Sequence, residues 1–473
     1  MNIINTNTRC VARFFPFKNR ETLDGNDTNS AMEATELFED DAIFSCSVTR
    51  EKSAPYGSFN LNLKPIKNYY NLIRPGDWVI IYLDDSKNID IKDLKGVKCV
   101  GTVSRMAYNK VTNNDGSIVT TFSISGCDFG RIFEVSEFFY NPYAPEEFIR
   151  AFVQDLDLKL QGSPMDYVNG MLDIYLGNAQ NQNLREMLFQ MLIPSKVYEA
   201  LKGGDSSKGF AVSFNDIVKR KFNKNAEEGF CLFKDVNKMN AASLWSVLQQ
   251  SANTIVNEIY TDIEDGQPTL VFQKQPLTKD QILEAARDAT ELSEAYIINY
   301  NLGLSDFEIF NYMSIWPSDQ MINSFAYLAS AELAGKIPSI AQDSIKRFGF
   351  RMIDRQTDYA YQEGAYLFSQ LGAWIDEVKE FWFNCYHFES GTIEVIGRNN
   401  FNIGRFIKIP ERDVIYRIEG ITWDWAYGDH LVTSLTVTYG MKSDGTYLDQ
   451  DDSEGMPYGT TVYERKNDKK YGV

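Results

Sequence analysis

Two stretches that lie far apart in this chain match position by position. Residues 118–125 read IVTTFSIS and residues 431–438 read LVTSLTVT, and a glycine follows each of them closely. Upstream, in the same order, two further pairs match: 101–103 with 420–422, and 76–81 with 404–409. The first region has longer loops, at 84–96 and 109–117, and such insertions cost little free energy. Either any two antiparallel hairpins rich in threonine and valine look alike, or the chain carries two copies of one small β-barrel.

Each matching stretch has the pattern of a strand with one buried face. Phe122 and Ile124 are separated by small hydroxyl residues, in a segment that is otherwise β-branched. The segment 113–116 reads NNDG, a strong hairpin signal, and 75–77 reads PGD, a turn signal before the run WVIIYL. Residues 56–140 are therefore expected to form a small antiparallel barrel or sandwich. The residues expected on equivalent strands of the two copies are Trp78, Ile80, Val119, Phe122 and Ile124, and Phe406, Ile407, Val432, Leu435 and Val437.

Between the two β regions the sequence predicts mostly helices. Phe148, Phe152 and Leu156 recur at helical spacing, and residues 213–253 and 278–386 are also expected to be mostly helical. A short strand pair is expected near 256–273, joined around Asp265-Gly266 and ended by Pro276. Residues 203–209 are rich in glycine but lack the spacing of a phosphate-binding loop, so they are interpreted as a flexible connector.

Length and charge exclude several classes of protein. The chain has 473 residues, which is enough for several domains, with 65 acidic and 47 basic residues and a net charge of −18. Such acidity argues against a protein that wraps nucleic acid, because phosphates are neutralised by Lys and Arg. The six cysteines are scattered without a CxxC motif, which favours folding in a reducing compartment. No signal peptide pattern and no apolar run of about 20 residues is present, so we expect no membrane insertion and synthesis in a cytoplasm.

The sequence offers no persuasive catalytic, cofactor or metal site. Cys385 and His387 lie two residues apart at the end of an expected helix, where they do not share a face, so both are expected in the core. His430 follows a turn and is expected at the surface. The acidic residues after 443 lack the spacing of a calcium-binding loop. Paired carboxylates could hydrolyse glycans, but an acidic chain always offers some pair.

In its order of motifs the chain resembles the baseplate hub proteins of contractile-tailed bacteriophages, over residues 56–442. The motifs of the first barrel are 75–82 (PGDWVIIY), 101–103 (GTV) and 122–131 (FSISGCDFGR). The remaining motifs are 244–248 (LWSVL), 257–262 (NEIYTD), 270–276 (LVFQKQP), 347–351 (RFGFR), 391–394 (GTIE), 404–407 (GRFI) and 433–440 (TSLTVTYG). Each motif is short, and the match consists in their order.

The resemblance implies an α+β fold with two related tube-like antiparallel β-barrels and largely helical domains between them. The implied domains are 1–141, a tube-like barrel with an acidic N-terminal segment; 142–276, helical with a strand pair; 277–388, helical; 389–442, a second tube-like barrel completed by strands near 256–273; and 443–473, an extended tail.

The resemblance also implies a function without catalysis. The chain would form a homotrimer in the virion, assembled in the host cytoplasm. It would join the sixfold tail tube, or tube-initiator proteins, to the threefold central spike, and it would contact other baseplate proteins. DNA would meet it only in passage. From the net negative charge of the chain we expect an acidic or neutral inner wall, because each Lys–phosphate contact would slow that passage. The tail residues Tyr447, Leu448, Tyr458 and Tyr463 are expected to contact the spike. The alternative is a tail-borne peptidoglycan hydrolase, which needs a carboxyl group with a raised pKa across a cleft from a second one.

Overall fold

The computed structural model describes most of the chain, in thirteen stretches. These are residues 8–17, 34–38, 42–84, 94–112, 118–138, 163–176, 192–202, 211–227, 242–305, 309–317, 339–357, 367–397 and 400–450. Phe148, Phe152 and Leu156 of one expected helix, and the connector at 203–209, lie outside these stretches. Among the described helices, none is long and apolar enough to cross a membrane.

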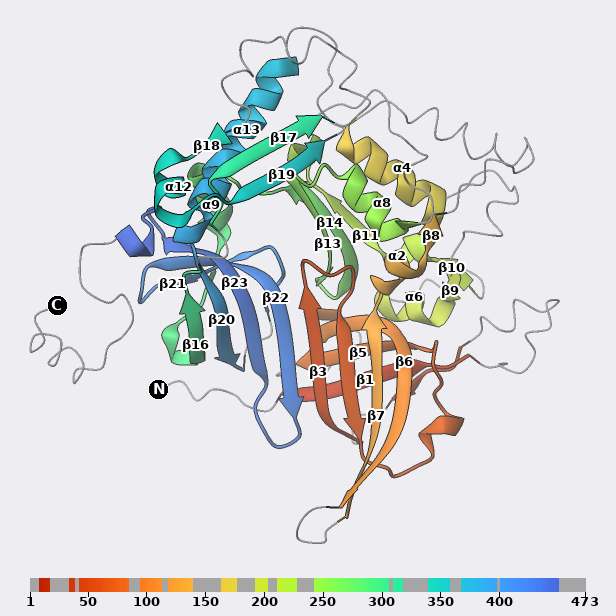
Figure 1. Cartoon of the computed structure of the whole chain (residues 1–473). Helices are drawn as coiled ribbons and strands as arrows, with labels where there is room; N and C mark the ends of the chain where they lie inside the picture. Colours follow the sequence, from red (N-terminus) through yellow and green to blue (C-terminus); the bar gives the residue numbers. More distant parts are fainter. Residues whose placement is uncertain are drawn as a thin grey trace, which may run out of the picture.

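One thirteen-stranded sheet dominates the fold (Figure 1). Its neighbouring strands run in the order β16-β20-β23-β22-β3-β4-β7-β6-β5-β1-β2, and β21 and β15 lie beside β22. The strands of the N-terminal part are β1 (Arg9–Phe15), β2 (Leu37–Phe38), β3 (Ile43–Glu51), β4 (Ser58–Leu63), β5 (Trp78–Asp84), β6 (Val97–Thr112) and β7 (Ile118–Asp128). The others are β15 (Thr290–Glu291), β16 (Ile297–Gly303), β20 (Glu389–Ile396), β21 (Phe406–Ile409), β22 (Val414–Ala426) and β23 (Val432–Lys442).

The sheet consists of two series of strands with the same order. In the first series the neighbours are β3-β4-β7-β6-β5-β1, and in the second they are β16-β20-β23-β22-β21-β15. We call the position of a strand in its series its rank. Strands of the same rank also occur in the same order along the chain in the two series. The outermost pairs differ, because β1 runs antiparallel to β5 whereas β15 runs parallel to β21. The matching stretches 118–125 and 431–438 lie mainly on β7 and β23, which have the same rank in the two series.

The described residues form no closed barrel, because the two series join. The first half of β22 pairs with β21, and its second half extends past β21 to pair with β3 over residues 420–426. The long β22 therefore makes one sheet of what the sequence predicts to be two separate barrels. The strands expected to complete the second barrel lie elsewhere: β13 (Asn257–Glu264) and β14 (Gln267–Lys274) form a three-stranded sheet with β11 (Lys219–Phe222). Instead, β15 and β16 supply the missing strands of the second series.

The segments expected to be largely helical contain strands as well. The helices are α2 (Arg131–Val135), α4 (Pro164–Leu176), α6 (Ser195–Lys202), α7 (Phe214–Ile217), α8 (Leu244–Ser251), α9 (Lys279–Ala285), α12 (Gln342–Phe348) and α13 (Leu367–Asn384). The small sheets use β8 (Glu137–Phe138) with β12 (Ala242–Ser243), β9 (Leu192–Pro194) with β10 (Ala211–Ser213), and β17 (Tyr312–Pro317) with β18 (Ser339–Ile340) and β19 (Met352–Thr357). Figure 1 shows the helices gathered at one end of the large sheet.

The expected one-sided burial is present in both series. Phe122, Ile124, Leu435 and Val437 are all buried in one hydrophobic core that both series share. Strand β5 is buried on both faces, because residues such as Val79 face this core while Trp78, Ile80 and Tyr82 pack against the helices. A strand covered on both sides reads as a continuous apolar run, which accounts for the sequence WVIIYL.

Two details of the sequence alignment are wrong. Gly101 lies opposite Asp128, whereas Gly420 lies opposite Thr436, so the residue of β6 that corresponds to Gly420 is Ala107, opposite Ser123. Gly101 lies six residues before Ala107, so the short motif GTV is matched to the wrong part of the strand. Residues 109–112 are strand, so the two hairpins have equally many residues between their strands, 113–117 and 427–431. The loop after β5 is longer than the loop after β21, as predicted.

Candidate functional site

One face of the large sheet carries short uncharged polar side chains on strands of both series. These residues alternate with buried apolar residues, as the period of two in a strand requires. We call this surface the polar face. Its residues are Ser45, Ser47, Thr49, Asn60, Asn62, Asn109, Thr121, Ser123 and Ser125 in the first series, and Asn299, Asn301, Thr392, Thr422, Ser434 and Thr436 in the second, placed together by cross-strand pairing.

Hydrogen bonds link the polar side chains across the strands. The Asn62 amide donates to the Ser45 hydroxyl at 2.9 Å, and the Ser123 hydroxyl donates to the Asn62 carbonyl oxygen at 2.6 Å. The Asn109 amide in turn donates to the Ser123 hydroxyl at 3.1 Å. These bonds run across four adjacent strands and link their short polar side chains. The face is thereby hydrophilic.

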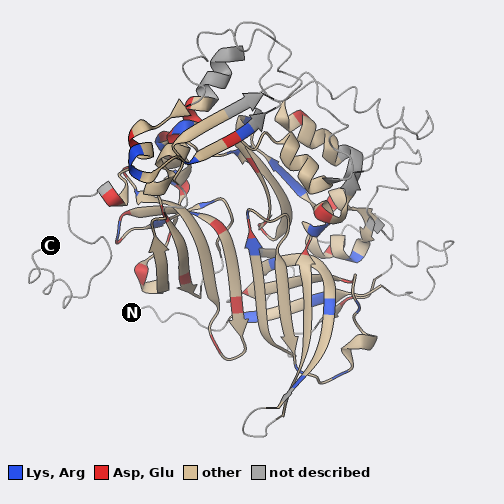
Figure 2. Cartoon of the chain, viewed as in Figure 1, with Lys and Arg blue, Asp and Glu red and all other residues tan. Residues whose placement is uncertain are grey.

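Few charged side chains lie on the polar face. Its described strands add three carboxylates, Glu51, Glu394 and Asp424, and one guanidinium, Arg105. Figure 2 shows most of the large sheet in tan, the colour of uncharged residues. The side chains present cannot concentrate positive charge on this surface.

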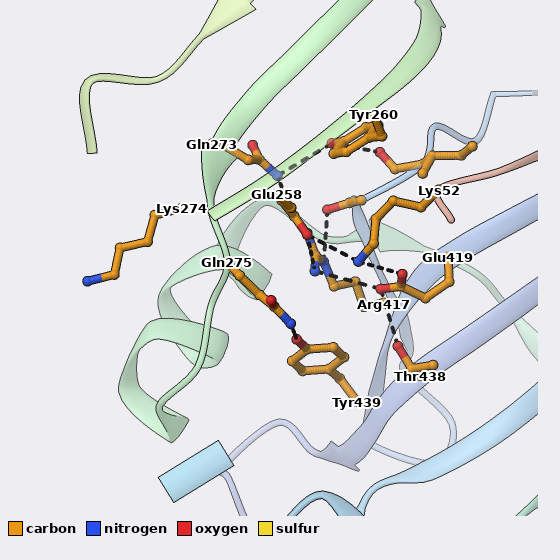
Figure 3. A network of polar contacts seen from close by, with 12 residues as sticks. Lys52, Glu258, Tyr260, Gln273, Lys274, Gln275, Arg417, Glu419, Thr438 and Tyr439 are labelled. Atoms are coloured by element: carbon orange, nitrogen blue, oxygen red, sulfur yellow. Dashed lines mark hydrogen bonds and ion pairs between the residues drawn. The ribbon is translucent and has the colours of Figure 1, made fainter. Parts of the chain in front are cut away.

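A buried ion-pair network joins the second series to the strand pair β13–β14 (Figure 3). Arg417 of β22 contacts both carboxylate oxygens of Glu258 on β13, with Nη1 at 3.1 Å from Oε2. Lys52 Nζ also lies 3.1 Å from Glu258 Oε2 and contacts Glu419. The Gln273 amide donates to Glu258 Oε1 at 2.7 Å. Burial alone would raise the pKa of Glu258, but Arg417 and Lys52 outweigh it and lower that pKa to about 2.

A second buried network joins the same strand to the first series. Arg50 of β3 contacts Asp128 Oδ2 at 3.2 Å and Asp262 Oδ1 at 3.1 Å, and it donates to the Lys98 carbonyl oxygen at 3.1 Å. Burial lowers the pKa of Arg50, but the two carboxylates outweigh it and raise that pKa above its ordinary value. Glu258 and Asp262 lie on the same face of β13, four residues apart. One strand therefore holds both series of the large sheet through two buried arginines.

Between the two networks, strand β13 makes a close contact with the backbone next to β21. The Tyr260 hydroxyl donates to the Ile403 carbonyl oxygen at 3.3 Å. Gly404 has a φ of 74°, and a Cβ there would lie 2.3 Å from the Tyr260 hydroxyl oxygen. Only glycine accommodates both the backbone conformation and the close approach. Sequence reasoning missed Glu258, Asp262 and their arginines as a functional group.

The residues expected on equivalent strands all lie on strands of the large sheet. Phe122, Ile124, Leu435 and Val437 point into the shared core, together with Ile407. Trp78, Ile80 and Phe406 are buried on the opposite side of their strands, where Trp78 and Ile80 pack against one helical cluster and Phe406 against another. Val119 and Val432 lie opposite Val111 and Asp424 at the free ends of the two long hairpins. These residues build the sheet and do not form a binding site of their own.

The tail residues expected to contact a partner divide into two groups. Tyr447 and Leu448 are buried within this chain, at 4 % and 8 % exposure, so little of either side chain is left for a spike to contact. The Tyr447 ring stacks on His387, with ring centroids 4.9 Å apart, and packs edge-on against Phe388. The fold extends to residue 450 because these side chains complete a hydrophobic cluster. Tyr458 and Tyr463 lie outside the described residues.

The described residues contain no cluster that could hold a metal ion. Cys385 is buried, as predicted, and its thiol donates to the Trp382 carbonyl oxygen at 3.2 Å. His387 is only partly buried, and its Nδ1 lies 2.6 Å from Asp449 Oδ2. His430 is exposed, as predicted. Asp444 accepts a hydrogen bond from the Thr446 backbone, and this contact occupies one of the acidic residues considered as calcium ligands.

Comparison with known proteins gives similarity only at the level of solved structures. No family model and no curated protein matches this chain. The 43 kDa tail protein of prophage MuSo2 from Shewanella oneidensis is 11 % identical with a TM-score of 0.48, over 93 % of this chain and 99 % of that one. The tail protein from Neisseria meningitidis MC58 is 11 % identical with a TM-score of 0.46, over 92 % and 98 %. The phage P2 baseplate structure gives 8 % identity and a TM-score of 0.29, over 91 % and 98 %.

Proposed function

We propose that this chain is a structural hub protein of a phage tail baseplate, without catalytic activity of its own. Three copies form a ring that joins a sixfold tail tube to a threefold central spike. The observation that carries this proposal is the pair of strand series with the same order in one sheet. Three chains with two series each present six similar units to the tube, while the rest of each chain keeps threefold symmetry.

The polar face supplies the wall of the DNA conduit in this proposal. A protein binds DNA by neutralising phosphates with Lys and Arg, and every such contact would slow the passage of DNA. The polar face offers neutral hydroxyl and amide groups and more carboxylates than cations. A trimer carries three times −18, or −54, formal charges, which adds repulsion at long range.

The first test measures mass and hydrolysis together. We expect the purified chain to have the mass of a trimer by light scattering, and to leave purified peptidoglycan intact after prolonged incubation. A monomer would contradict the hub proposal. A monomer that releases soluble glycan would favour the alternative of a tail-borne hydrolase, for which no specific pair of carboxyl groups stands out.

The second test adds positive charge to the polar face. The variant Asn60→Lys/Thr436→Lys places two exposed lysines on this face in each chain. We expect this variant to bind a linear DNA duplex that the unmodified protein does not bind. The logarithm of its binding constant should fall by about 0.9 for each phosphate contact when the salt concentration rises tenfold.

A matched control carries the same added charge elsewhere. Gln250→Lys/Gln342→Lys lies on α8 and α12, outside the large sheet, and is expected to bind DNA no better than the unmodified protein. Equal binding by both variants, or strong binding by the unmodified protein, would show that the polar face is not the surface that DNA passes.

A further inference from the structure

Two strand edges of the large sheet have no neighbour among the described residues. On β6, residues 97–102 pair with β5, and residues 105–112 have a paired strand only on the β7 side. On β16, residues pair with β20 on one side only, since β16 ends the sheet. Open edges of this kind attract other strands, and proteins usually cover or blunt them.

The chain itself shows which strands these two edges fit. Strand β22 has the same rank as β6, and β3 has the same rank as β16. Within one chain, β22 and β3 are paired antiparallel over residues 420–426 and 45–51. The edge open on β6 is thus the edge that β22 uses, and the edge open on β16 is the edge that β3 uses.

Burial at corresponding positions supports this comparison. Tyr108 of β6 corresponds to Ile421 of β22, since they lie opposite the equivalent Phe122 and Leu435. Ile421 is 1 % exposed beside β3, whereas Tyr108 is 54 % exposed. An apolar side chain is therefore left uncovered where its counterpart is covered by the joined strand.

The register of the missing pair follows from the same equivalences. Val111 corresponds to Asp424, which lies opposite Ser47 of β3. Cys46 corresponds to Leu302. Cys46 is connected to Ile124 of β7 through two successive cross-strand pairs, and Leu302 is connected in the same way to Val437 of β23, the equivalent of Ile124. Counting one residue further along each strand, Ser47 corresponds to Gly303 and Val48 to Leu304.

We propose that the end of β6 in one copy pairs antiparallel with the end of β16 and the residues directly after it in the next copy, with Val111 opposite Gly303 and Lys110 opposite Leu304. The inference rests on the proposed function, which supplies the second copy. Leu304 is 51 % exposed, whereas its counterpart Val48 is 1 % exposed, so this pairing buries a second apolar side chain. The contact is head-to-tail and repeats the step already made inside each chain, so it closes a ring whose units all have the same neighbours.

The test is a pair of cysteines across the proposed junction. Cα atoms opposite one another in antiparallel strands are about 4.5 to 5.5 Å apart, within the range that a disulfide spans. Lys110 and Leu304 are both exposed, so Lys110→Cys/Leu304→Cys is expected to fold normally. After mild oxidation we expect most of this variant to run as a covalent trimer on a non-reducing gel.

The control shifts one cysteine along the same strand. Asn299 is exposed and lies five positions before Leu304, so in Lys110→Cys/Asn299→Cys the two Cα atoms are about 17 Å out of register. This control is expected to remain unlinked. Mixed trimers of the two single variants, Lys110→Cys and Leu304→Cys, should give linked dimers, which shows that the bond joins different chains.

The outcomes separate the two proposals. A trimer by mass that does not link through Lys110→Cys/Leu304→Cys, or that links equally through the shifted control, overturns the strand pairing and leaves the hub proposal standing. A monomer by mass overturns the hub proposal and the pairing with it.

Discussion

Replacing Arg417 by methionine is expected to lower the free energy of unfolding by about 3 to 5 kcal/mol, because the change leaves a buried carboxylate without its main partner. Glu258 has only 7 % of its side chain exposed, and Arg417 supplies two of its contacts. Lys52 and Gln273 remain beside it but cannot replace a bidentate guanidinium. Urea denaturation of the purified chain, followed by tryptophan fluorescence, measures the change.

Two further variants show that the effect comes from the unpaired charge. Glu258→Gln/Arg417→Met removes both charges and is expected to recover a large part of the lost stability. Lys196→Met breaks an exposed ion pair with Glu199, in which the side chains are 50 % and 30 % exposed, and is expected to change stability by less than about 1 kcal/mol. A loss in Arg417→Met no larger than the loss in Lys196→Met would contradict the assignment of Arg417 as a structural centre.

The second large effect is a loss of stability in acid. The pKa of Glu258 is about 2 in the folded chain, against an ordinary value of 4.5. A carboxyl group with a lowered folded pKa stabilises the fold above its unfolded pKa and loses this contribution as the pH falls through the folded value. The shift corresponds to about 3 kcal/mol, present at pH 6 and lost progressively between about pH 5 and pH 2.

Comparison with Glu258→Gln isolates this group from the other carboxyl groups. The difference in unfolding free energy between the unmodified chain and this variant should be large at pH 6 and should shrink steeply toward pH 2. A difference that stays constant over this range would mean that Glu258 is not held ionised by Arg417 and Lys52. Urea denaturation at each pH gives the required values.

Local features of the fold could be predicted because short segments determine them. The NNDG segment predicts a hairpin, and the strands β6 and β7 on either side of it are paired antiparallel as far as Thr112 and Ile118. The turn at Asp265-Gly266 is also confirmed: both residues have positive φ, at 52° and 75°, and join β13 to β14. Alternation of hydroxyl and apolar residues gave the correct buried face on β7 and β23.

Contacts between distant segments could not be predicted, because the sequence of a strand does not determine which other strand lies beside it. The second half of β22 has the same alternation whether β3 lies beside it or not, so the joined sheet was missed. Tyr447 and Leu448 lie in a polar segment, and only the folded chain shows the hydrophobic cluster that buries them. The charges at Glu258 and Asp262 carried one usable signal, since two carboxylates on the same face of a strand need cations beside them wherever that face is buried.

The junction between β22 and β3 also affects how the chain is synthesised. Thr49 and Thr422 are hydrogen-bonded across it although 373 residues separate them. At a translation rate of about 5 to 20 residues per second, the ribosome needs roughly 20 to 75 s to supply the neighbour of β3. During that interval the nascent chain exposes a bare strand edge, and on a crowded polysome the β22 of an adjacent, more complete chain can reach it first. Exchange of this strand between growing chains would produce misassembled oligomers. Because the two halves of the sheet lie so far apart in the sequence, we expect the emerging chain to need chaperones that shield unpaired strands.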